Sequence, residues 1–560
     1  MSHGKDPLDA LFELGMNQKA AFTPDRVVPS APGVKEEEPV ERQIPLYGQY
    51  ADFFYDSKPS AELLKKEHER FFEKDAAQQM RLSDIKRLEE GLCAKYHITP
   101  PKNIKNNIKN GANEEDEHIL AIGTTIDDRR HPRTWGINQL DRTYHTHLLG
   151  PSGSGKSTLL RQMLVQDLWY HRGGLLLEPH GDLSLNCLMA TPPYRIHDTI
   201  YLNVLDKEYS PGFNPLDMPA NVSDAERYES VAEVVALMVK HFEVQSSSVR
   251  LLKALENALN ALSYVPGATI LEVMDFYNNP DIQSTVLSFM PEGPLKDNIA
   301  SIAINTKPDE LMSLENRISR FNSNRLLKHL FGQSKSTIDF AEEMNRGAMV
   351  ICPVPKGGTK DDFFLHFYGE YIVSVVYKAA MMRESMDEKE RIIFPLTIDE
   401  FQNFMSGDIE NMLAELRKYG LPLCLAHQYL GQLDSGIWDA INNSCRTKLT
   451  YRLGSNDAPV MAKAFPGCTA DDLMSIQKYH VMAQPLIHGQ EQRPFLTKLF
   501  MPLENLSSSA QVVADLVVEF SRNDYMTPRD EIEKDIEERK ERLASGNKDA
   551  IIEMASRKNK

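Results

Sequence analysis

Residues 147–160 read HLLGPSGSGKSTLL, a glycine-rich G-x-x-x-x-G-K-S loop in an apolar frame. In such a loop, glycines let successive backbone N–H groups turn toward phosphate oxygens. We expect Lys156 to reach the terminal phosphates of a nucleotide and the Ser157 hydroxyl to ligate Mg²⁺. The predicted phosphate-binding residues are Gly150, Pro151, Ser152, Gly153, Ser154, Gly155, Lys156, Ser157 and Thr158.

The two flanks of the loop separate this interpretation from a chance Gly/Ser-rich turn. The apolar triplet His147–Leu149 predicts a strand that enters the loop, and STLLRQMLVQDLW places its leucines at helical spacing. A helix that begins at the loop adds its positive dipole end to the phosphate site. The predicted cofactors are therefore ATP and Mg²⁺.

An acidic pair follows a second apolar stretch, RIIFPLTIDEFQNF. Pro395 cannot donate to a central ladder, so we expect a short strand that begins after it and ends at Asp399. Asp399 would hold Mg²⁺ through its water shell, and Glu400 would polarise the attacking water. The alternative is a surface acidic pair after a core strand. The phosphate loop favours the catalytic interpretation.

A third apolar run, Leu421–Ala426, ends in His427-Gln428. A neutral amide at this position can hydrogen-bond both the γ-phosphate and the attacking water. Gln428 would thereby sense whether ATP has been cleaved. A plain turn at the strand end is the alternative.

Short apolar runs alternate with helical stretches from Ile119 onward, which predicts an α/β fold with a mainly parallel sheet. The expected strands are residues 119–124, 147–149, 174–177, 348–354, 396–398, 423–426 and 447–453. Residues 219–345 break the alternation with amphipathic helices and indicate an all-helical insertion. Residues 60–97 predict two charged helices interrupted at Ser83-Asp84.

Composition sets outer limits on the function. With 41 % apolar residues and a formal net charge of −17, the chain reads as an ordinary globular protein. The acidity weighs only slightly against DNA, because a few basic loops facing a pore would suffice for a ring-shaped motor. No run of about 18 apolar residues or signal-peptide pattern is present. Six scattered cysteines without C-x-x-C argue against a zinc site or disulfides and fit a reducing cytosol.

The strings GPSGSGKST, LLLEPHGDLS, GFNPLD, TIDEFQNF, LRKYGLPLCLAHQYLGQL and YRLGSNDA follow one another in the order of the HerA–FtsK superfamily. Over residues 118–525, the chain most resembles the conjugative coupling proteins (TraD/TraG-like) of type IV secretion and their soluble relatives. The resemblance implies a RecA-like P-loop ATPase core, hexameric rings and DNA driven through a central pore. It also implies an arginine supplied by the neighbouring subunit, which would stabilise charge on the transferred phosphoryl group.

The candidates for this arginine are Arg417, Arg446 and Arg452. We favour Arg417, which precedes the Gln428 strand as the family's basic pair does; a surface helix end is the alternative. Two features depart from the family. The chain has no predicted membrane span, and Glu178 stands where the family usually has Asp. Glu178 and Asp182 are therefore expected only to support the metal ligands, without binding the metal themselves.

The resemblance and the composition together give an expected organisation. It comprises an extended or disordered arm (1–58), a small helical N-terminal region with a linker (59–117), the first part of the ATPase domain (118–218), the all-helical insertion (219–345), the second part of the ATPase domain (346–506) and a charged helical tail (507–560). The expected conformation of the tail is a solvated terminal helix.

DNA contacts are expected through backbone phosphates, since no base-recognition motif is present. One candidate cluster lies in the insertion, at Arg317, Arg320, Arg325 and Lys328, with a solvated helix face as the alternative. The other is Lys356 and Lys360 in a glycine-bearing loop. The linker lysines Lys102, Lys105 and Lys109 are expected to belong to a soluble tether.

The sequence thus predicts a hexameric, Mg²⁺-dependent ATPase that translocates DNA in the cytoplasm, or peripherally at a membrane channel. A second hypothesis is a docking receptor that recruits protein cargo such as a relaxase, a nuclease or a secretion-channel protein. A third keeps the motor for genome packaging or for driving a partner nuclease. The predicted catalytic residues are Lys156, Glu400, Gln428 and Arg417, and the predicted metal ligands are Ser157 and Asp399.

Overall fold

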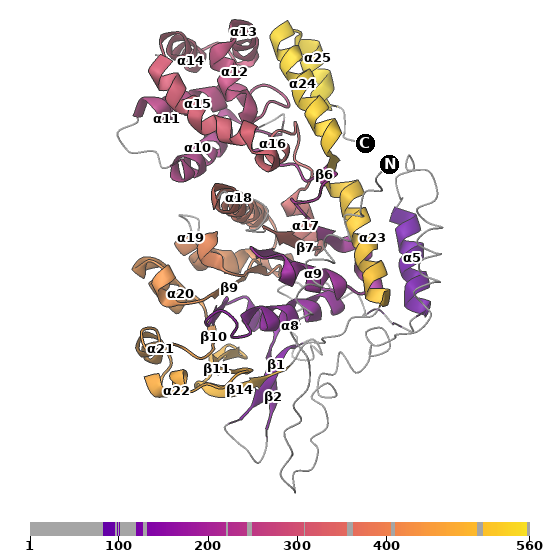
Figure 1. Ribbon diagram of the computed structural model, residues 1–560, viewed down its shortest axis with the longest axis vertical. Coiled ribbons are helices and arrows are strands. Elements are labelled where there is room, and N and C mark those ends of the chain that lie inside the picture. The colour runs from indigo at the N-terminus through magenta and orange to yellow at the C-terminus, as the bar shows by residue number, and fades with distance from the viewer. Residues whose placement is uncertain are drawn as a thin grey trace, which may run out of the picture.

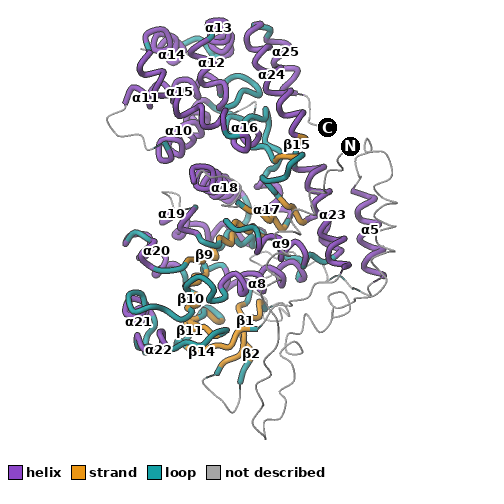
Figure 2. Tube along the Cα trace, in the orientation of Figure 1, coloured by secondary structure: helices purple, strands orange, loops and turns teal. Residues whose placement is uncertain are grey.

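A mainly parallel sheet organises the chain (Figures 1 and 2). The computed structural model describes residues 82–95, 98, 100, 119–126, 132–219, 222–242, 249–306, 308–354, 362–404, 409–500 and 508–556. The expected arm 1–58, the linker lysines and the loop with Lys356 and Lys360 lie outside these residues.

Within the described residues the main sheet has 11 strands. One side of it is parallel, in the spatial order β10 (Thr447–Thr450), β3 (Thr146–Leu149), β9 (Leu423–His427), β8 (Leu396–Ile398), β4 (Gly174–Glu178), β7 (Met349–Pro353) and β5 (Thr199–Tyr201). An antiparallel side continues from β10 through β11 (His480–Gln484), β14 (Phe495–Leu499), β1 (Leu120–Thr125) and β2 (Thr134–Ile137). Two further ribbons pair β12 (Leu486–Ile487) with β13 (Gln490–Glu491) and β15 (Thr527–Pro528) with β6 (Tyr209–Ser210).

The expected α/β class with a mainly parallel sheet is confirmed. Each of the seven predicted strands is present within a few residues of its expected bounds, although β1 joins the antiparallel side instead of the parallel one. Strands β3, β4, β7, β8 and β9 are buried at every position because helices cover both faces. Strand β8 begins directly after Pro395, as predicted.

Helices cover the two faces of the sheet with separate apolar cores. The first core contains α8 (Lys156–Trp169), α9 (Asp182–Met189), α23 (Ser508–Tyr525) and α5 (Leu82–Lys95), with the short η3 (Pro193–Asp198). The second contains α18 (Asp362–Met381), α17 (Phe340–Arg346), α19 (Ile409–Glu415), η9 (Leu416–Tyr419) and α20 (Ser435–Ser444). A third, smaller core joins Leu149 to α21 (Ala458–Ala464) and α22 (Ala470–Met474). The remaining short elements are α7 (Gln139–Arg142), η4 (Ile270–Glu272), η6 (Met382–Ser385), η7 (Glu388–Glu390), η8 (Phe401–Asn403) and η10 (Leu430–Gln432).

Within the described chain, the seven α-helices that follow β6 gather at one end of the molecule (Figure 1). The helices are α10 (Asp224–His241), α11 (Val249–Leu262), α12 (Val273–Asn278), α13 (Pro280–Phe289), α14 (Pro294–Asn305), α15 (Pro308–Ser323) and α16 (Arg325–Phe331). Helix α10 begins where the Ser223 hydroxyl accepts from the Glu226 N–H and the Glu226 carboxylate accepts from the Ser223 N–H.

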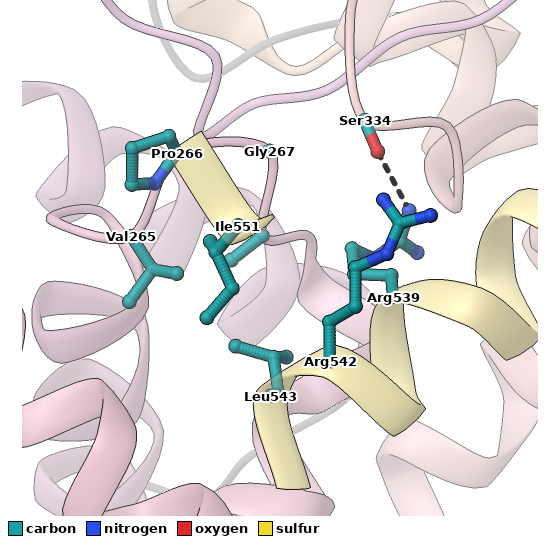
Figure 3. Close-up of a pocket in the computed structure, with 9 residues that line it drawn as sticks. Val265, Pro266, Gly267, Ser334, Arg539, Arg542, Leu543 and Ile551 are labelled. Atoms are coloured by element: carbon teal, nitrogen blue, oxygen red, sulfur yellow. Dashed lines mark hydrogen bonds between the residues drawn. The ribbon is translucent and has the colours of Figure 1, made fainter. Parts of the chain in front are cut away.

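The expectation of a solvated C-terminal helix was wrong. Helix α23 buries Val513, Val517 and Phe520 against the sheet. Helices α24 (Arg529–Ser545) and α25 (Lys548–Ser556) then lie along the helical region. Arg539 of α24 is buried, ion-pairs with Glu272 at 2.9 Å and donates to Ser334 (Figure 3). Several of the charges that suggested a solvated surface are paired across this interface, among them Glu533 with Lys328 and Lys540 with Asp275.

Among the described helices, none is both long enough and apolar enough to cross a bilayer.

Candidate active site

The glycine-rich loop leaves β3 and ends where α8 begins at Lys156. Gly153 and Gly155 have φ values of 75° and 108°, in the left-handed region that side-chain-bearing residues rarely adopt. The first turn of α8 directs free N–H groups into the loop. Pro151 and Ser152 are exposed and Thr158 is half-buried at the rim.

The Lys156 ammonium is buried under the loop it would serve. Its Nζ donates to the Gly150 carbonyl at 2.7 Å and lies 3.8 Å from Glu400 Oε1. Burial lowers the pKa of Lys156, while Glu400 and Asp399 act in the opposite direction. The structure therefore brings the loop lysine and the acidic pair to one place, as the sequence predicted.

Ser157 and Asp399 are joined directly. The Ser157 hydroxyl donates to Asp399 Oδ2 at 2.8 Å, and Asp399 follows the last residue of β8. Burial raises the pKa of Asp399, and the hydrogen bond from Ser157 opposes the rise. Two hard oxygen donors lie side by side here, which is the type of ligand that Mg²⁺ prefers.

Glu400 has a left-handed backbone, with φ 51° and ψ 49°, which is strained for a residue that bears a side chain. Asn403 holds this turn, because its side-chain amide donates to the Glu400 carbonyl at 3.0 Å. Both carboxylate oxygens of Glu400 accept amide hydrogen bonds, Oε1 from Gln428 at 2.9 Å and Oε2 from Gln402 at 2.7 Å.

Gln428 reaches Glu400 because β9 lies between β3 and β8 in the sheet. The carboxyl ends of these parallel strands meet at one edge, so the loop, the amide and the acids converge there. The Gln428 N–H donates to Gln432 Oε1 at 3.1 Å, which fixes the turn after β9. The sequence predicted contacts from Gln428 to phosphate and water. In the structure its amide is bound to Glu400.

These residues fit a nucleotide polyphosphate with a hard divalent cation. The loop offers N–H donors and an ammonium group, while Ser157 and Asp399 supply the oxygens. Among the described residues, no cluster of three or more His, Cys, Asp or Glu side chains could hold a metal by itself. A cation would accordingly complete its shell with phosphate oxygens and water, as Mg²⁺ commonly does.

The three candidate arginines lie at two edges of the sheet. Arg417 precedes β9, is exposed, and its guanidinium stacks 3.5 Å from the ring centroid of Tyr144, which precedes β3. It therefore lies at the edge opposite its own phosphate loop. Arg446 lies at that same edge and ion-pairs with Glu491 at 2.5 Å. Arg452 follows β10 and is exposed on the loop's side.

Glu178 ends β4 beside the site, but its carboxylate caps α9. It accepts from the backbone N–H of His180 at 2.8 Å and of Ser184 at 3.1 Å. Asp182 is exposed in the first turn of the same helix. Glu178 therefore fixes the loop beside Asp399, and the charge of its carboxylate contributes to the raised pKa of Asp399.

The predicted basic cluster in the helical region is divided among internal contacts. Arg317 donates to the Ser313 carbonyl at 2.9 Å, Arg320 lies 5.2 Å from the ring centroid of Phe363, and Lys328 ion-pairs with Glu533. Arg325 is exposed. Three of these four cations thus have partners within the chain, which favours a structural role over a free basic surface.

Sequence reasoning missed several residues around the site. Gln402 lies inside the DEFQNF string but was not recognised as a partner of Glu400. His147 of β3 and His427 of β9 form a buried pair, with their Nε2 atoms 2.8 Å apart. Tyr451, which follows β10, contacts the phosphate loop. The sequence placed His147 and His427 at predicted strands, but it gave no signal that these strands are adjacent.

One comparison with known proteins matches part of this region. Residues 394–463 match the family model described as the TraM recognition site of TraD and TraG, which supports the expected resemblance over that segment. The segment contains Asp399, Glu400 and Gln428, and so covers the acidic half of the site but not the loop. No curated protein matches the chain in sequence.

Among solved structures, the chain is similar to the plasmid coupling protein TrwB in complex with the GTP analogue GDPNP. The identity is 12 % and the TM-score 0.45, over 67 % of this chain and 89 % of that one. It is also similar to VirB4 of Thermoanaerobacter pseudethanolicus, at 13 % identity and a TM-score of 0.48, over 69 % and 97 % of the two chains. TrwB in complex with ADP and Mg²⁺ gives 13 % identity and a TM-score of 0.45, over 67 % and 90 %.

Proposed function

We propose that this protein is a Mg²⁺-dependent ATPase that drives DNA through a ring of subunits, in the manner of conjugative coupling proteins. One observation carries the proposal. The phosphate loop, the Ser157–Asp399 pair and the Gln428–Glu400 pair converge at the carboxyl edge of three neighbouring strands.

Each side chain has a role that its contacts support. The loop N–H groups and Lys156 bind the β- and γ-phosphates, and Ser157 with Asp399 holds the cation. Glu400 orients the attacking water and takes its proton, which needs an ionised carboxylate within hydrogen-bond reach of that water. The contacts that Glu400 makes with Gln428 and Gln402 hold the carboxylate in place before the nucleotide arrives.

Assembly into a hexamer would complete the site. Arg417 is exposed at the edge of the sheet opposite its own loop, so we assign it to the loop of a neighbouring subunit. An arginine supplied in this way makes hydrolysis depend on ring formation, because it stabilises charge only in the assembled state. We propose a cytoplasmic location, with peripheral contact at a membrane channel; the six free cysteines are consistent with a reducing compartment.

A docking receptor for protein cargo is the second candidate. It is favoured by the description of the matched segment, 394–463, as the recognition site for the partner TraM in TraD and TraG. On this account nucleotide binding holds the ring together, and the ring recruits a relaxase or another DNA-processing protein.

ATPase activity with and without DNA separates the two candidates. The motor predicts that duplex or single-stranded DNA stimulates hydrolysis several-fold in wild-type protein and not in Lys156→Ala. Stimulation by protein cargo alone would favour the receptor. Absence of ATP hydrolysis in the assembled wild-type protein under every condition would overturn the proposal. Negative-stain images of Glu400→Gln with ATP and DNA would show the number of subunits and the occupancy of the pore.

A further inference from the structure

Tyr451 lies directly beside the phosphate loop. It follows the last residue of β10, and its N–H donates to the Leu149 carbonyl at 2.8 Å, which extends the pairing of β10 with β3 to the start of the loop. Its side chain is 2 % exposed. A Cβ on Gly150 would lie 2.6 Å from the Tyr451 Cβ, so the loop can pass Tyr451 only because residue 150 is glycine.

The phenol of Tyr451 donates to the Gly155 carbonyl at 2.8 Å. Burial raises the pKa of Tyr451, so its hydroxyl keeps its proton and stays a donor. Because the peptide unit is planar, the direction of the Gly155 carbonyl fixes that of the Lys156 N–H. This N–H belongs to the first turn of α8 and has no partner within the helix.

The residues that follow Tyr451 anchor it from the other side. The Leu453 N–H donates to the Leu473 carbonyl at 3.1 Å, and Leu453 is packed in the small core that contains α21 and α22. A displacement of these two helices would therefore be transmitted along three residues to the phosphate loop.

We propose that Tyr451 is a positioning residue for nucleotide binding, which orients the Gly155–Lys156 peptide toward the phosphates and links the loop to α21 and α22. This inference rests on the proposed function and assigns a new residue to the same site. The hydroxyl of Tyr451 contacts the loop backbone at Gly155. It acts through the loop backbone.

A structural role alone would give a different result, and the chain offers a matched control. Tyr194 is also buried, and its hydroxyl donates to the Trp169 carbonyl at 2.5 Å, at the far end of the same helix α8. Tyr451→Phe and Tyr194→Phe each remove one phenol-to-carbonyl hydrogen bond and keep the ring. The hydrogen bond that is lost lies at opposite ends of α8 in the two variants.

The test measures the affinity of a fluorescent ATP analogue and of ADP for full-length wild-type protein and both variants, together with kcat, KM and the melting temperature. Loss of one neutral hydrogen bond predicts that Tyr451→Phe weakens both nucleotides about threefold to tenfold. We expect KM for ATP to rise by a similar factor, with kcat changed by less than about twofold. Tyr194→Phe should lower the melting temperature comparably and leave nucleotide affinity unchanged.

Equal affinities in wild-type protein and Tyr451→Phe would overturn the role of Tyr451 while leaving the ATPase proposal intact. Equal losses in the two variants would do the same, because they would indicate general destabilisation. Failure of wild-type protein to bind ATP would overturn the proposed function itself. If Tyr451→Phe proves less stable, amide hydrogen exchange gives the second measurement. Faster exchange confined to residues 150–157 supports the proposal, and uniformly faster exchange contradicts it.

Discussion

The side-chain amide of Gln428 donates a 2.9 Å hydrogen bond to Glu400 Oε1, although the two residues are 28 positions apart in the sequence. They leave the sheet from neighbouring strands, β9 and β8, which places them at the same edge. A bound γ-phosphate would compete for the same amide. We therefore expect Gln428 to release the Glu400 carboxylate when nucleotide binds and to bind it again after phosphate has left.

Truncation of this amide tests the arrangement. For Gln428→Ala we expect kcat to fall about tenfold to a hundredfold, because a preorganised donor at the reacting centre is lost. KM should change less than about threefold. Gln511→Ala is the control, since that side chain also donates from an amide to a carboxylate, at Asp515 on the distant α23. A kcat for Gln428→Ala equal to that of the control would contradict the assignment.

The Ser157 hydroxyl should set the dependence on Mg²⁺. Ser157→Ala removes both the proposed cation ligand and the hydrogen bond to Asp399. We expect hydrolysis to fall at least a hundredfold, on the order of the loss of other charge-stabilising groups. Ser157→Thr keeps the hydroxyl and should retain most of the activity. Titration of Mg²⁺ at fixed ATP measures the effect, and identical Mg²⁺ curves for the alanine variant and wild-type protein would exclude this role.

Three buried histidines predict a loss of stability in acid. Burial lowers the pKa of His145 to about 4, that of His427 to about 3 and that of His147 well below its ordinary value of 6.5. The unfolded chain therefore binds more protons than the folded chain below pH 6.5. In that window the free energy of unfolding decreases as the pH decreases, by about 1.4 kcal/mol per pH unit for each histidine.

The histidine pair provides the variant for this measurement. Replacing both partners, as His147→Leu with His427→Leu, removes two of these three histidines without leaving one unpaired. Urea unfolding between about pH 4 and pH 6 should then show a slope smaller by about 2.7 kcal/mol per pH unit. The exposed His180→Ala should leave the slope unchanged. A wild-type slope in the double variant would contradict the assignment of this pH dependence to the two histidines.

Docking of the C-terminal helices depends on Arg539. Its side chain is 6 % exposed and that of its partner Glu272 is 3 % exposed. Arg539→Ala should cost about 3–5 kcal/mol of stability, because it leaves a buried carboxylate unpaired. Arg542→Ala breaks a more exposed pair with Glu538 on the same helix and should cost less than about 1 kcal/mol. Denaturant unfolding of both variants measures the difference. Equal losses would contradict a buried, structural ion pair.

The sequence was most informative where the chain is buried on both faces. Continuous apolar runs such as those of β4 and β7 could be assigned because parallel strands covered by helices carry no alternating pattern. The short β5 and the antiparallel β11 and β14 were missed. Strand β5 pairs with β7 and β14 pairs with β1, and both of these partners lie far along the chain. The tail was misjudged for a related reason. Charge density alone cannot distinguish a solvated helix from one whose charges are paired.

The candidate site also divides into residues that the sequence predicted and residues that it missed. Phosphate-binding and acidic residues carry their chemistry in residue type and spacing, so Lys156, Ser157 and Asp399 could be placed together before the fold was known. Tyr451 has no such signature. Its role depends on which strand lies beside β3, and a sequence pattern does not give the order of strands in a sheet.

The most direct test of the central claim compares ATP binding and ATP hydrolysis in one preparation of Glu400→Gln protein. If Lys156, Asp399 and Glu400 enclose one triphosphate, this variant binds ATP with an affinity near that of wild-type protein. Its turnover falls at least a hundredfold, the loss expected when a general base is removed. Hydrolysis by Glu400→Gln at the wild-type rate would contradict the account.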